Sequence, residues 1–213
     1  MKTPIVLLWI TLALAGCDLG GIRGNRRIVT EEHTVPAFTN LDVSGGFQVD
    51  WRSGSPSASV TADQNLMGFI ELRVSGNVLH VRTTRSVRPS HSIKLTLTGN
   101  SLEGARFSGA SRFTAHAMSG ARFSLETSGA SKVNLDGAVG ELVASMTGAS
   151  NLRAESLKVK AAELSLTGAS DAHLTISETL KVSITGAGKV EYGGNPPHIE
   201  RHITGAGTIR KRD

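Results

Sequence analysis

The seven histidines are the side chains of this sequence best suited to bind a metal ion or to transfer a proton near neutral pH. Two of them, His198 and His202, are four residues apart and would face one metal ion together only on a helix. Pro196 and Pro197 directly precede them, and the repeat described below predicts an extended strand there. The HExxH, GxSxG and Walker patterns are absent. We therefore expect no metal site and no cofactor. The histidines are His33, His80, His91, His116, His173, His198 and His202.

Acidic residues in the second half of the chain leave a catalytic alternative open. Polysaccharide lyases and glycosidases built on parallel β-helices use clustered carboxylates or basic residues on one face. Spacing in the sequence does not bring these acids together, and a solvated charged face explains them more simply. The same holds for Arg82, Arg85 and Arg88, which could meet lipid phosphates but are explained more simply as solvated charges. The acids are Asp136, Glu141, Glu155, Glu163, Asp171 and Glu178.

Hydroxyl groups recur at regular intervals in a short motif, [Ser/Thr]-Gly-Ala-[Ser/Gly], which occurs six times. Two interpretations of these hydroxyls remain open. They could satisfy backbone hydrogen bonds at tight turns, as Ser and Thr commonly do. Alternatively, they could present a flat hydroxyl array to a glycan or a protein partner. The first residues of the six copies are Ser108, Ser128, Thr147, Thr167, Thr185 and Thr204.

The spacing of these motifs predicts a repeat architecture. Successive copies are 20, 19, 20, 18 and 19 residues apart, and a period near 19 over six copies is typical of a solenoid. Around each motif apolar residues alternate with polar ones, as in the segment Leu180–Thr185, and this period of two favours strands over helices. We therefore predict an all-β parallel β-solenoid (β-helix) with about 19 residues per rung. We expect a right-handed coil, although the repeat does not determine the hand.

The elements that position the hydroxyls are the strands on either side of each Gly-Ala step. Glycine suits the unusual backbone angles of a tight corner, and we expect the alanine, such as Ala149, to face a narrow interior. Side chains should fill this interior, because a rung of about 19 residues has a perimeter of only about 60 Å. Polar residues interrupt the apolar columns at Glu103, Arg201 and Lys211, which predicts polar caps at both ends.

Residues 30–98 lack clean copies of the motif and are predicted to form a less regular β cap at the start of the solenoid. Trp51 is expected to pack in this cap rather than bind a sugar. The predicted strands are Thr39–Val43, Phe47–Trp51, Ala58–Ala62, Ile70–Val74, Val78–Thr83 and Ile93–Thr98.

Cys17 is the only cysteine, so an intrachain disulfide is excluded. The apolar run Ile5–Leu14 is too short to span a bilayer and indicates a secretory signal. Its end, Leu14-Ala15-Gly16-Cys17, resembles the lipobox of bacterial lipoproteins. That resemblance implies cleavage before Cys17, acylation of Cys17 and attachment to a membrane through the acyl chains.

Residues 17–29 are predicted to be the lipidated cysteine followed by a Gly/Arg-rich tether. Its three arginines could contact anionic headgroups or remain solvated. Asp18 resembles an inner-membrane retention signal of enterobacterial lipoproteins, but the rule differs among bacteria, so we do not assign the membrane.

Charge and aromatic content argue against nucleic-acid binding. The net charge is only +5, with 23 basic and 18 acidic residues, and aromatic residues make up 4% of the chain. So few stacking platforms and so small an excess of charge predict no nucleic-acid partner.

The segments Phe38–Val49 and Val74–Val81, together with the repeated Ser/Thr-Gly-Ala-Ser motifs, resemble the head-GIN-domain family across about residues 30–210. The proposed role of that family is that of an autotransporter adhesin, and it is otherwise a domain of unknown function. The resemblance implies a β-solenoid on an envelope-associated protein, with no catalytic residues to carry over.

Together these observations predict a signal peptide (1–16), a lipidated tether (17–29) and one solenoid domain (30–213), with the cap at 30–98 and regular repeats at 99–213. We expect a non-catalytic adhesion, binding or structural module in the bacterial cell envelope, held at a membrane by its lipid anchor. The expected partner is a glycan or an envelope protein. An enzyme acting on envelope polysaccharide is the alternative.

Overall fold

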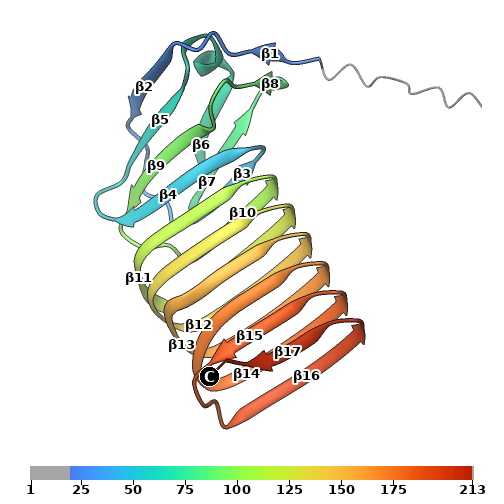
Figure 1. Cartoon of the computed structure of the whole chain (residues 1–213). Coiled ribbons are helices and arrows are strands. Elements are labelled where there is room, and N and C mark those ends of the chain that lie inside the picture. Colours follow the sequence, from blue (N-terminus) through green and yellow to red (C-terminus); the bar gives the residue numbers. More distant parts are fainter. Residues whose placement is uncertain (1–19, 213) are drawn as a thin grey trace, which may run out of the picture.

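The computed structural model describes residues 20–212, and it confirms an all-β parallel β-solenoid of about five turns. Figure 1 shows the rungs stacked below an irregular cap, with the C-terminus at the far end. The helical element of the described chain is a short 3-10 turn, Gln64–Phe69. Within residues 20–212, no helix is long and apolar enough to cross a membrane.

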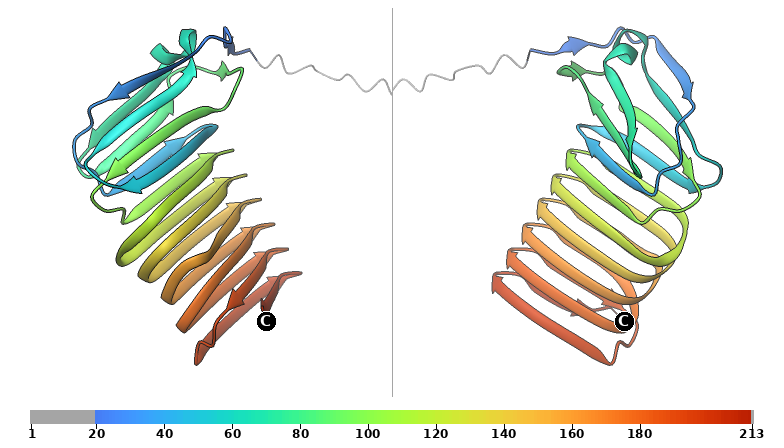
Figure 2. Two further views of the ribbon diagram at one scale, coloured as in Figure 1. Left: turned by 60° about the vertical axis from the view of Figure 1, so that its left-hand side comes forward. Right: turned by 180° about the vertical axis from the view of Figure 1, so that it is seen from behind.

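The regular rungs form because each strand pairs in parallel with the residues one repeat away. For example, Thr147 of one rung is in register with Thr167 of the next, and Leu142 is in register with Ala162. The views in Figure 2 show the same stacking from two further sides. The strands of this part are β10 (Gly104–Gly109), β11 (Arg112–Gly129), β12 (Lys132–Gly148), β13 (Asn151–Gly168), β14 (Asp171–Gly186), β15 (Lys189–Gly193), β16 (His198–Gly205) and β17 (Thr208–Lys211).

The interior is filled by the apolar columns that the alternating pattern predicts. In β12, Leu142, Ala144 and Met146 are all buried, while the intervening Ser145 is exposed. Burying apolar side chains contributes about 25 cal/mol per Å² of surface removed from water, so the stacked columns are the main source of stability. The expectation of a filled core is thereby confirmed.

The corner of each rung differs from the prediction. Ala149 is exposed, and Ser150 after it is buried, with 2% of its surface accessible. Gly148 adopts a φ of +105°, in the region that favours glycine, and this turn breaks the strict alternation. The residues on both sides of the glycine therefore face outward, and the residue after the alanine faces inward. The expectation that the alanine column lines the interior was wrong.

The inward serines supply the hydrogen bonds of the corner. Ser111 Oγ donates to the Gly45 carbonyl at 2.8 Å, and Ser170 Oγ donates to the Gly148 carbonyl at 3.3 Å. Ser170 Oγ also accepts a hydrogen bond from the Ser150 amide at 3.3 Å. A buried hydroxyl must find partners, and these backbone groups provide them. In the first four copies of the motif, the corner role considered for the first hydroxyl is therefore filled by the last one; the other two copies end in Gly188 and Gly207.

The cap continues the rungs and then closes them. β3 (Asn40–Ser44) and β4 (Phe47–Ser53) pair in parallel with β10 and β11, and β7 (Val78–Thr83) and β9 (Ile93–Gly99) stack on them in turn. Antiparallel pairs then cover the end: β6 (Ile70–Ser75) on β7, and β5 (Ser57–Asp63) on β9 with β2 (Ile28–His33) beyond it. All six predicted cap strands are present, and Trp51 is buried as expected.

Much of the predicted tether is part of the cap. β1 (Ile22–Arg23) pairs with β8 (Val87–Arg88), and β2 begins at Ile28. Asp63 lies beneath this segment and is fully buried. Its carboxylate accepts hydrogen bonds from the Arg26 amide at 2.7 Å and from the Ser90 amide and hydroxyl at 2.8 and 2.7 Å. These contacts link residues far apart in the sequence, so composition alone could not reveal them. Cys17 lies outside the described residues.

The opposite end of the solenoid is more open. In β16, Arg201 occupies a position that is apolar in the inner rungs, and it donates a hydrogen bond to the Tyr192 hydroxyl at 3.1 Å. Ile203 on the same strand is 41% exposed. An inward-pointing charge at an edge strand discourages pairing with another chain. The polar interruptions at Arg201 and Lys211 therefore lie on the last rung, as the repeat predicts.

Candidate functional site

The outward side of the strands that precede each corner forms one long surface, which we call the hydroxyl face. Because every rung has Ser or Thr before its corner glycine, these hydroxyls stack in register along the solenoid axis, about 4.8 Å apart. The structure brings all six predicted hydroxyls into this column and adds Ser44 of β3. Ser44 does not belong to the six motifs, because Gly45-Gly46 and not Gly-Ala follows it. The column runs Ser44, Ser108, Ser128, Thr147, Thr167, Thr185 and Thr204.

A second column lies two residues before the first on the same face. In the central rungs it consists of Ser145, Ser165 and Ser183, which are in register with one another. Each of these rungs therefore presents a Ser-x-Thr pair, with its two hydroxyls about 6.6 Å apart along the strand. Toward the cap the same column changes to Glu126, then Arg106. These two columns are thus uncharged in the central rungs and charged near the cap, and the next outward position of the same strands carries Glu163 and Lys181.

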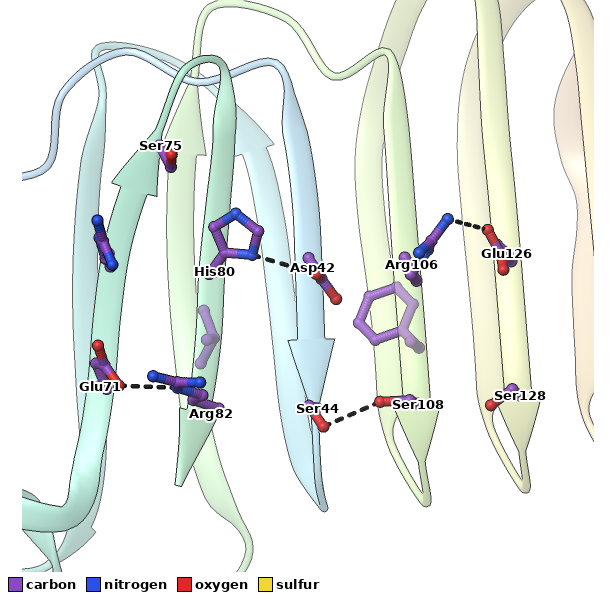
Figure 3. Close-up of a pocket in the computed structure, with 13 residues that line it drawn as sticks. Asp42, Ser44, Glu71, Ser75, His80, Arg82, Arg106, Ser108, Glu126 and Ser128 are labelled. Atoms are coloured by element: carbon purple, nitrogen blue, oxygen red, sulfur yellow. Dashed lines mark hydrogen bonds and ion pairs between the residues drawn. The ribbon is translucent and has the colours of Figure 1, made fainter. Parts of the chain in front are cut away.

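The charged end of the hydroxyl face is hollowed into a pocket of about 670 Å³. Strands β3, β6, β7, β10 and β11 contribute its walls, as Figure 3 shows. This size falls within the range of small-molecule sites. The residues that line it are Asp42, Ser44, Glu71, Arg73, Ser75, His80, Val81, Arg82, Arg106, Phe107, Ser108, Glu126 and Ser128.

Each of the three acids in this charged pocket is paired with a basic group. Arg82 Nε donates to Glu71 Oε2 at 2.8 Å across the antiparallel β6–β7 pair. Arg106 Nη2 lies 2.6 Å from Glu126 Oε2 on the next rung. Figure 3 shows both pairs pointing along the same surface, with Ser108 Oγ donating to Ser44 Oγ at 3.0 Å beside them. The third pair joins neighbouring strands, with His80 Nδ1 3.2 Å from Asp42 Oδ2.

The ion pair with Arg82 sets the electrostatics of Glu71 in the pocket. The hydrogen bond from Arg82, assisted by the charges of Arg82 and Arg73, lowers the pKa of Glu71 and outweighs the opposing effect of partial burial. A general acid at neutral pH needs a carboxyl group whose pKa is raised. Glu71 is shifted in the opposite direction. The pocket therefore offers fixed donors and acceptors, and Glu71 is not a carboxyl group prepared to donate a proton.

The acids singled out by the sequence do not line the charged pocket. Asp136 lies 3.0 Å from His116 on another part of the surface, and Glu141 pairs with Arg122 at 3.4 Å. Glu155 on β13 has its Oε1 3.7 Å from Nη1 of Arg212, which directly follows the last strand. Glu163 is exposed on β13, Asp171 is partly buried at the start of β14, and Glu178 is exposed on that strand. The convergent carboxylates that a polysaccharide-cleaving enzyme requires are not found in these six residues.

The histidines are likewise dispersed. His198 and His202 lie on the extended strand β16, as predicted, and not on a helix. His116 lies between Asp136 and Asp50, 3.4 Å from the latter, and His173 lies 3.1 Å from Glu191. Across residues 20–212, no group of three or more His, Cys, Asp or Glu side chains is placed to hold a metal ion.

The charged pocket was not identified from the sequence. Arg82 is one of three arginines close together in the sequence, and the structure separates them: Arg82 enters the pocket, whereas Arg85 lies over the ring of Phe69 at 5.9 Å. Alternation shows that Asp42, Arg106 and Glu126 face outward. It does not show that β7 and β6 stack beside β3, which is what adds His80 and Glu71 to the same hollow.

The fold defines the class of protein, a parallel β-solenoid closed by a mixed β cap. The chain belongs to the head GIN domain family: the family model described as "Putative auto-transporter adhesin, head GIN domain" matches residues 37–196. None of the curated proteins matches it.

Several solved structures share the fold. The "putative adhesin" of Bacteroides fragilis NCTC 9343 is 21% identical, with a TM-score of 0.70 over 90% of this chain and 100% of that one. The "putative adhesin" of Parabacteroides distasonis ATCC 8503 is 16% identical, with a TM-score of 0.61 over 91% of this chain and 100% of that one. A "putative lipid binding protein" from the same strain is 19% identical, with a TM-score of 0.54 over 91% and 100% of the two chains.

Proposed function

We propose that this protein is a non-catalytic binding module of the bacterial cell envelope that holds an extended glycan along its hydroxyl face. The observation that carries the proposal is the continuity of this surface. Seven stacked hydroxyls run without a break into the charged pocket. The column is about 29 Å long, from six intervals of about 4.8 Å, which suits a polymer of several sugar units.

The chemistry of the face matches that of a sugar chain. Sugar hydroxyls both donate and accept hydrogen bonds, as do the Ser and Thr hydroxyls of the central rungs. At the charged end, guanidinium groups such as those of Arg82 and Arg106 donate, while the carboxylates of Glu71 and Glu126 accept. Because the acids and bases are paired, the pocket offers both kinds of group at little net charge. Such a site fits a neutral or weakly acidic glycan.

The absence of catalysis is part of the same proposal. It is supported by the lowered pKa of Glu71 and by the dispersal of the six acids considered above. The description of the family as adhesins also favours binding over turnover. Cleavage of a polysaccharide by this chain would therefore contradict the proposal.

The envelope location and the lipid anchor rest on the N-terminal sequence and on the family. Leu14-Ala15-Gly16-Cys17 has the lipobox pattern, and two or more acyl chains hold a protein stably at a membrane. Changing Cys17 to Ser should prevent both acylation and cleavage, and mass spectrometry should find residues 1–16 still attached and no acyl chains. An unacylated N-terminal Cys17 in the native protein would contradict the anchor.

Binding is tested with the chain from residue 18 on a glycan array, alongside a product assay on the same polysaccharides. A Thr147→Glu, Thr167→Glu variant places two charges in the hydroxyl column and should abolish binding. Thr208→Glu adds one exposed charge on β17, outside the face, and should leave binding unchanged. Turnover would favour the enzyme. Neither binding nor turnover would direct attention to an envelope protein, which crosslinking in the native envelope would identify.

A further inference from the structure

Two arginines from segments far apart in the sequence lie next to each other at the cap end of the solenoid. The parallel pairing of β1 with β8 places Arg23 in register with Arg88. Figure 1 shows these two short strands side by side at the outer end of the cap. The preceding residues, Ile22 and Val87, are partly buried, whereas both arginines are exposed. Because residues in register on neighbouring strands share a face, the two guanidinium groups leave the strand pair on the same side.

Three more exposed arginines lie on the loops beside this strand pair. Arg26 and Arg27 follow β1, and the Arg26 amide holds their loop to the carboxylate of Asp63 at 2.7 Å. Arg85 precedes β8 and lies over the ring of Phe69 at 5.9 Å. Asp63 and Phe69 border the same short 3-10 turn, so both loops meet around it. We call the resulting patch the cap arginine surface; it consists of Arg23, Arg26, Arg27, Arg85 and Arg88.

No carboxylate neutralises the cap arginine surface within residues 20–212. None of its five arginines forms an ion pair there, whereas Arg82 and Arg106 of the charged pocket are both paired with glutamates. Asp63 lies beneath the surface, but it is buried and accepts its hydrogen bonds from two amides and a hydroxyl. Like charges in register on neighbouring strands are destabilising. An anionic partner would remove the repulsion between Arg23 and Arg88.

The backbone at Arg26 points to a role for its side chain. Arg26 has a φ of +63°, in the left-handed region that glycine and asparagine adopt at lower cost. Backbone strain of this kind is found preferentially at functional sites. Glycine would make the same turn without strain, so a charged side chain that contacts a partner gives a reason for arginine at this position.

The place of this surface in the chain favours a membrane as the partner. Ile22, the first residue of β1, is only five residues after Cys17, and five residues span at most about 17 Å. With Cys17 acylated, as proposed above, the cap arginine surface is held within that distance of the lipid headgroups. Attraction to an anionic leaflet acts over about one Debye length, about 8 Å at physiological salt. So short a tether allows the arginines to reach the bilayer surface.

We propose that the cap arginine surface binds the phosphate groups of an anionic lipid bilayer. Guanidinium groups donate hydrogen bonds to phosphate oxygens in a matching fork geometry. The cap then faces the bilayer, and the hydroxyl face and the open last rung extend away from it. Only the choice of the nearby surface rests on the proposed anchor. Bilayer binding is measured on the chain from residue 18, which lacks Cys17, so its failure and the failure of the anchor are distinguishable.

The test is co-sedimentation of the chain from residue 18 with lipid vesicles. Vesicles of phosphatidylcholine mixed with phosphatidylglycerol should bind the protein, and vesicles of phosphatidylcholine alone should not. Raising the salt from about 0.05 M to about 0.5 M should release it, because the Debye length falls about threefold. Inorganic phosphate at the same concentration of phosphate groups should not displace it, because one ion cannot reach all five arginines. Equal binding to both vesicles, no binding to the anionic ones, or displacement by phosphate would overturn the proposal.

A double variant and a matched control locate the surface. Arg23→Gln with Arg88→Gln should weaken binding to anionic vesicles about tenfold or more, because each arginine near such a membrane contributes about fivefold. Its melting temperature should not fall, because the change removes a repulsion. Arg153→Gln with Arg210→Gln removes the same charge from exposed positions on β13 and β17 and should not affect binding. An equal loss in this control would indicate non-specific attraction and overturn the site, as would full binding by the first variant.

The orientation of the solenoid on the bilayer gives a second readout. The chain from residue 18 contains no cysteine, so a single fluorophore can be attached at an introduced one. A label on Ser86→Cys, in the exposed loop before β8, should transfer energy efficiently to dye-labelled headgroups. A label on Thr208→Cys, on the last rung, should transfer weakly because it lies at the opposite end of the solenoid. Equal transfer from the two positions would overturn docking through the cap.

Discussion

The regular rungs and the N-terminal cap stabilise neighbouring strands by different means. From β10 to β15, each strand pairs in parallel with the same position of the adjacent repeat, and the corners are held by backbone and serine contacts. In the cap, antiparallel strands and single side chains such as Asp63 join residues far apart in the sequence. The rungs should therefore depend on many equivalent small contacts, and the cap on a few contacts that have no substitute.

The largest effect is expected at a corner glycine of the regular rungs. Gly168 has a φ of +99°, and a Cβ there would lie 2.6 Å from the Gly148 carbonyl oxygen. Gly168→Ala should therefore lower the free energy of unfolding by about 3 kcal/mol, through backbone strain and this clash. Chemical denaturation measures the change. Gly68→Ala is the control, because a Cβ there meets nothing within 4 Å. Equal stability of the two variants would show that the corners tolerate a side chain.

Asp63 is the corresponding weak point of the cap. Burial raises the pKa of Asp63, but the hydrogen bonds from Ser90 and from the Arg26 amide outweigh burial and hold the pKa below its usual value. Asp63→Asn should cost about 1–3 kcal/mol at neutral pH, because donors inside the cap lose a charged acceptor. Hydrogen exchange should become faster in β1 and β2 and stay unchanged in β13. Uniform acceleration along the whole chain would contradict a separate role for the cap.

The same carboxylate gives the cap a pH dependence. Because the pKa of folded Asp63 is lowered, its stabilising contribution is complete above the unfolded value of about 3.9 and is lost as the pH falls through the folded value. In the native protein, β1 and β2 should therefore lose exchange protection below about pH 4. Asp63→Asn should show no such step from this group. A step of the same size in that variant would assign it to another carboxyl group.

A smaller effect is expected within one corner, at Ala169 and Ser170. Ser170 is fully buried and hydrogen-bonded, so Ser170→Ala should cost about 1 kcal/mol. Ala169 is exposed, and Ala169→Phe should change stability by less than about 0.5 kcal/mol. The comparison of the two melting curves tests which residue faces inward. A large loss for Ala169→Phe with none for Ser170→Ala would reverse the assignment.

The smallest effect on stability is expected at the charged pocket. Arg106 and Glu126 are more than half and about half exposed, respectively, and surface ion pairs contribute about 0–1 kcal/mol. Glu126→Gln should therefore leave the melting temperature almost unchanged. Any loss of glycan binding by this variant would then report a contact with the ligand. A marked fall in stability would show instead that the pair supports the fold.

The comparison between rungs and cap also explains which features could be predicted from the sequence. The core columns of the rungs were predictable, because residues such as Leu180, Val182 and Ile184 alternate locally and the repeat supplies their partners. The direction of the corner residues was not, because Ala169 and Ser170 are both small and the positive φ of Gly168 reverses the expected alternation. The hydroxyl column was predicted because its residues belong to the motif itself.

In the cap the strands were predictable, but their partners were not. Nothing local indicates that Glu71 and Arg82 lie beside Asp42, because this depends on which strand stacks on β3. The folding of residues 22–29 onto the cap could not be predicted for the same reason: a Gly/Arg-rich segment has no pattern that points to Asp63. The sequence therefore predicts contacts that repeat, and it does not predict contacts that occur once.

The column of corner glycines also determines how the molecule could change in length. Each corner is bonded to the glycine of the rung before it in the same way, since the Ala169 amide donates to the Gly148 carbonyl and the Ala187 amide to that of Gly168. Because these contacts repeat from rung to rung, a whole rung could be duplicated or deleted without altering either end of the solenoid. The reach of the protein would then change in steps of about 4.8 Å, each adding or removing one hydroxyl of the column.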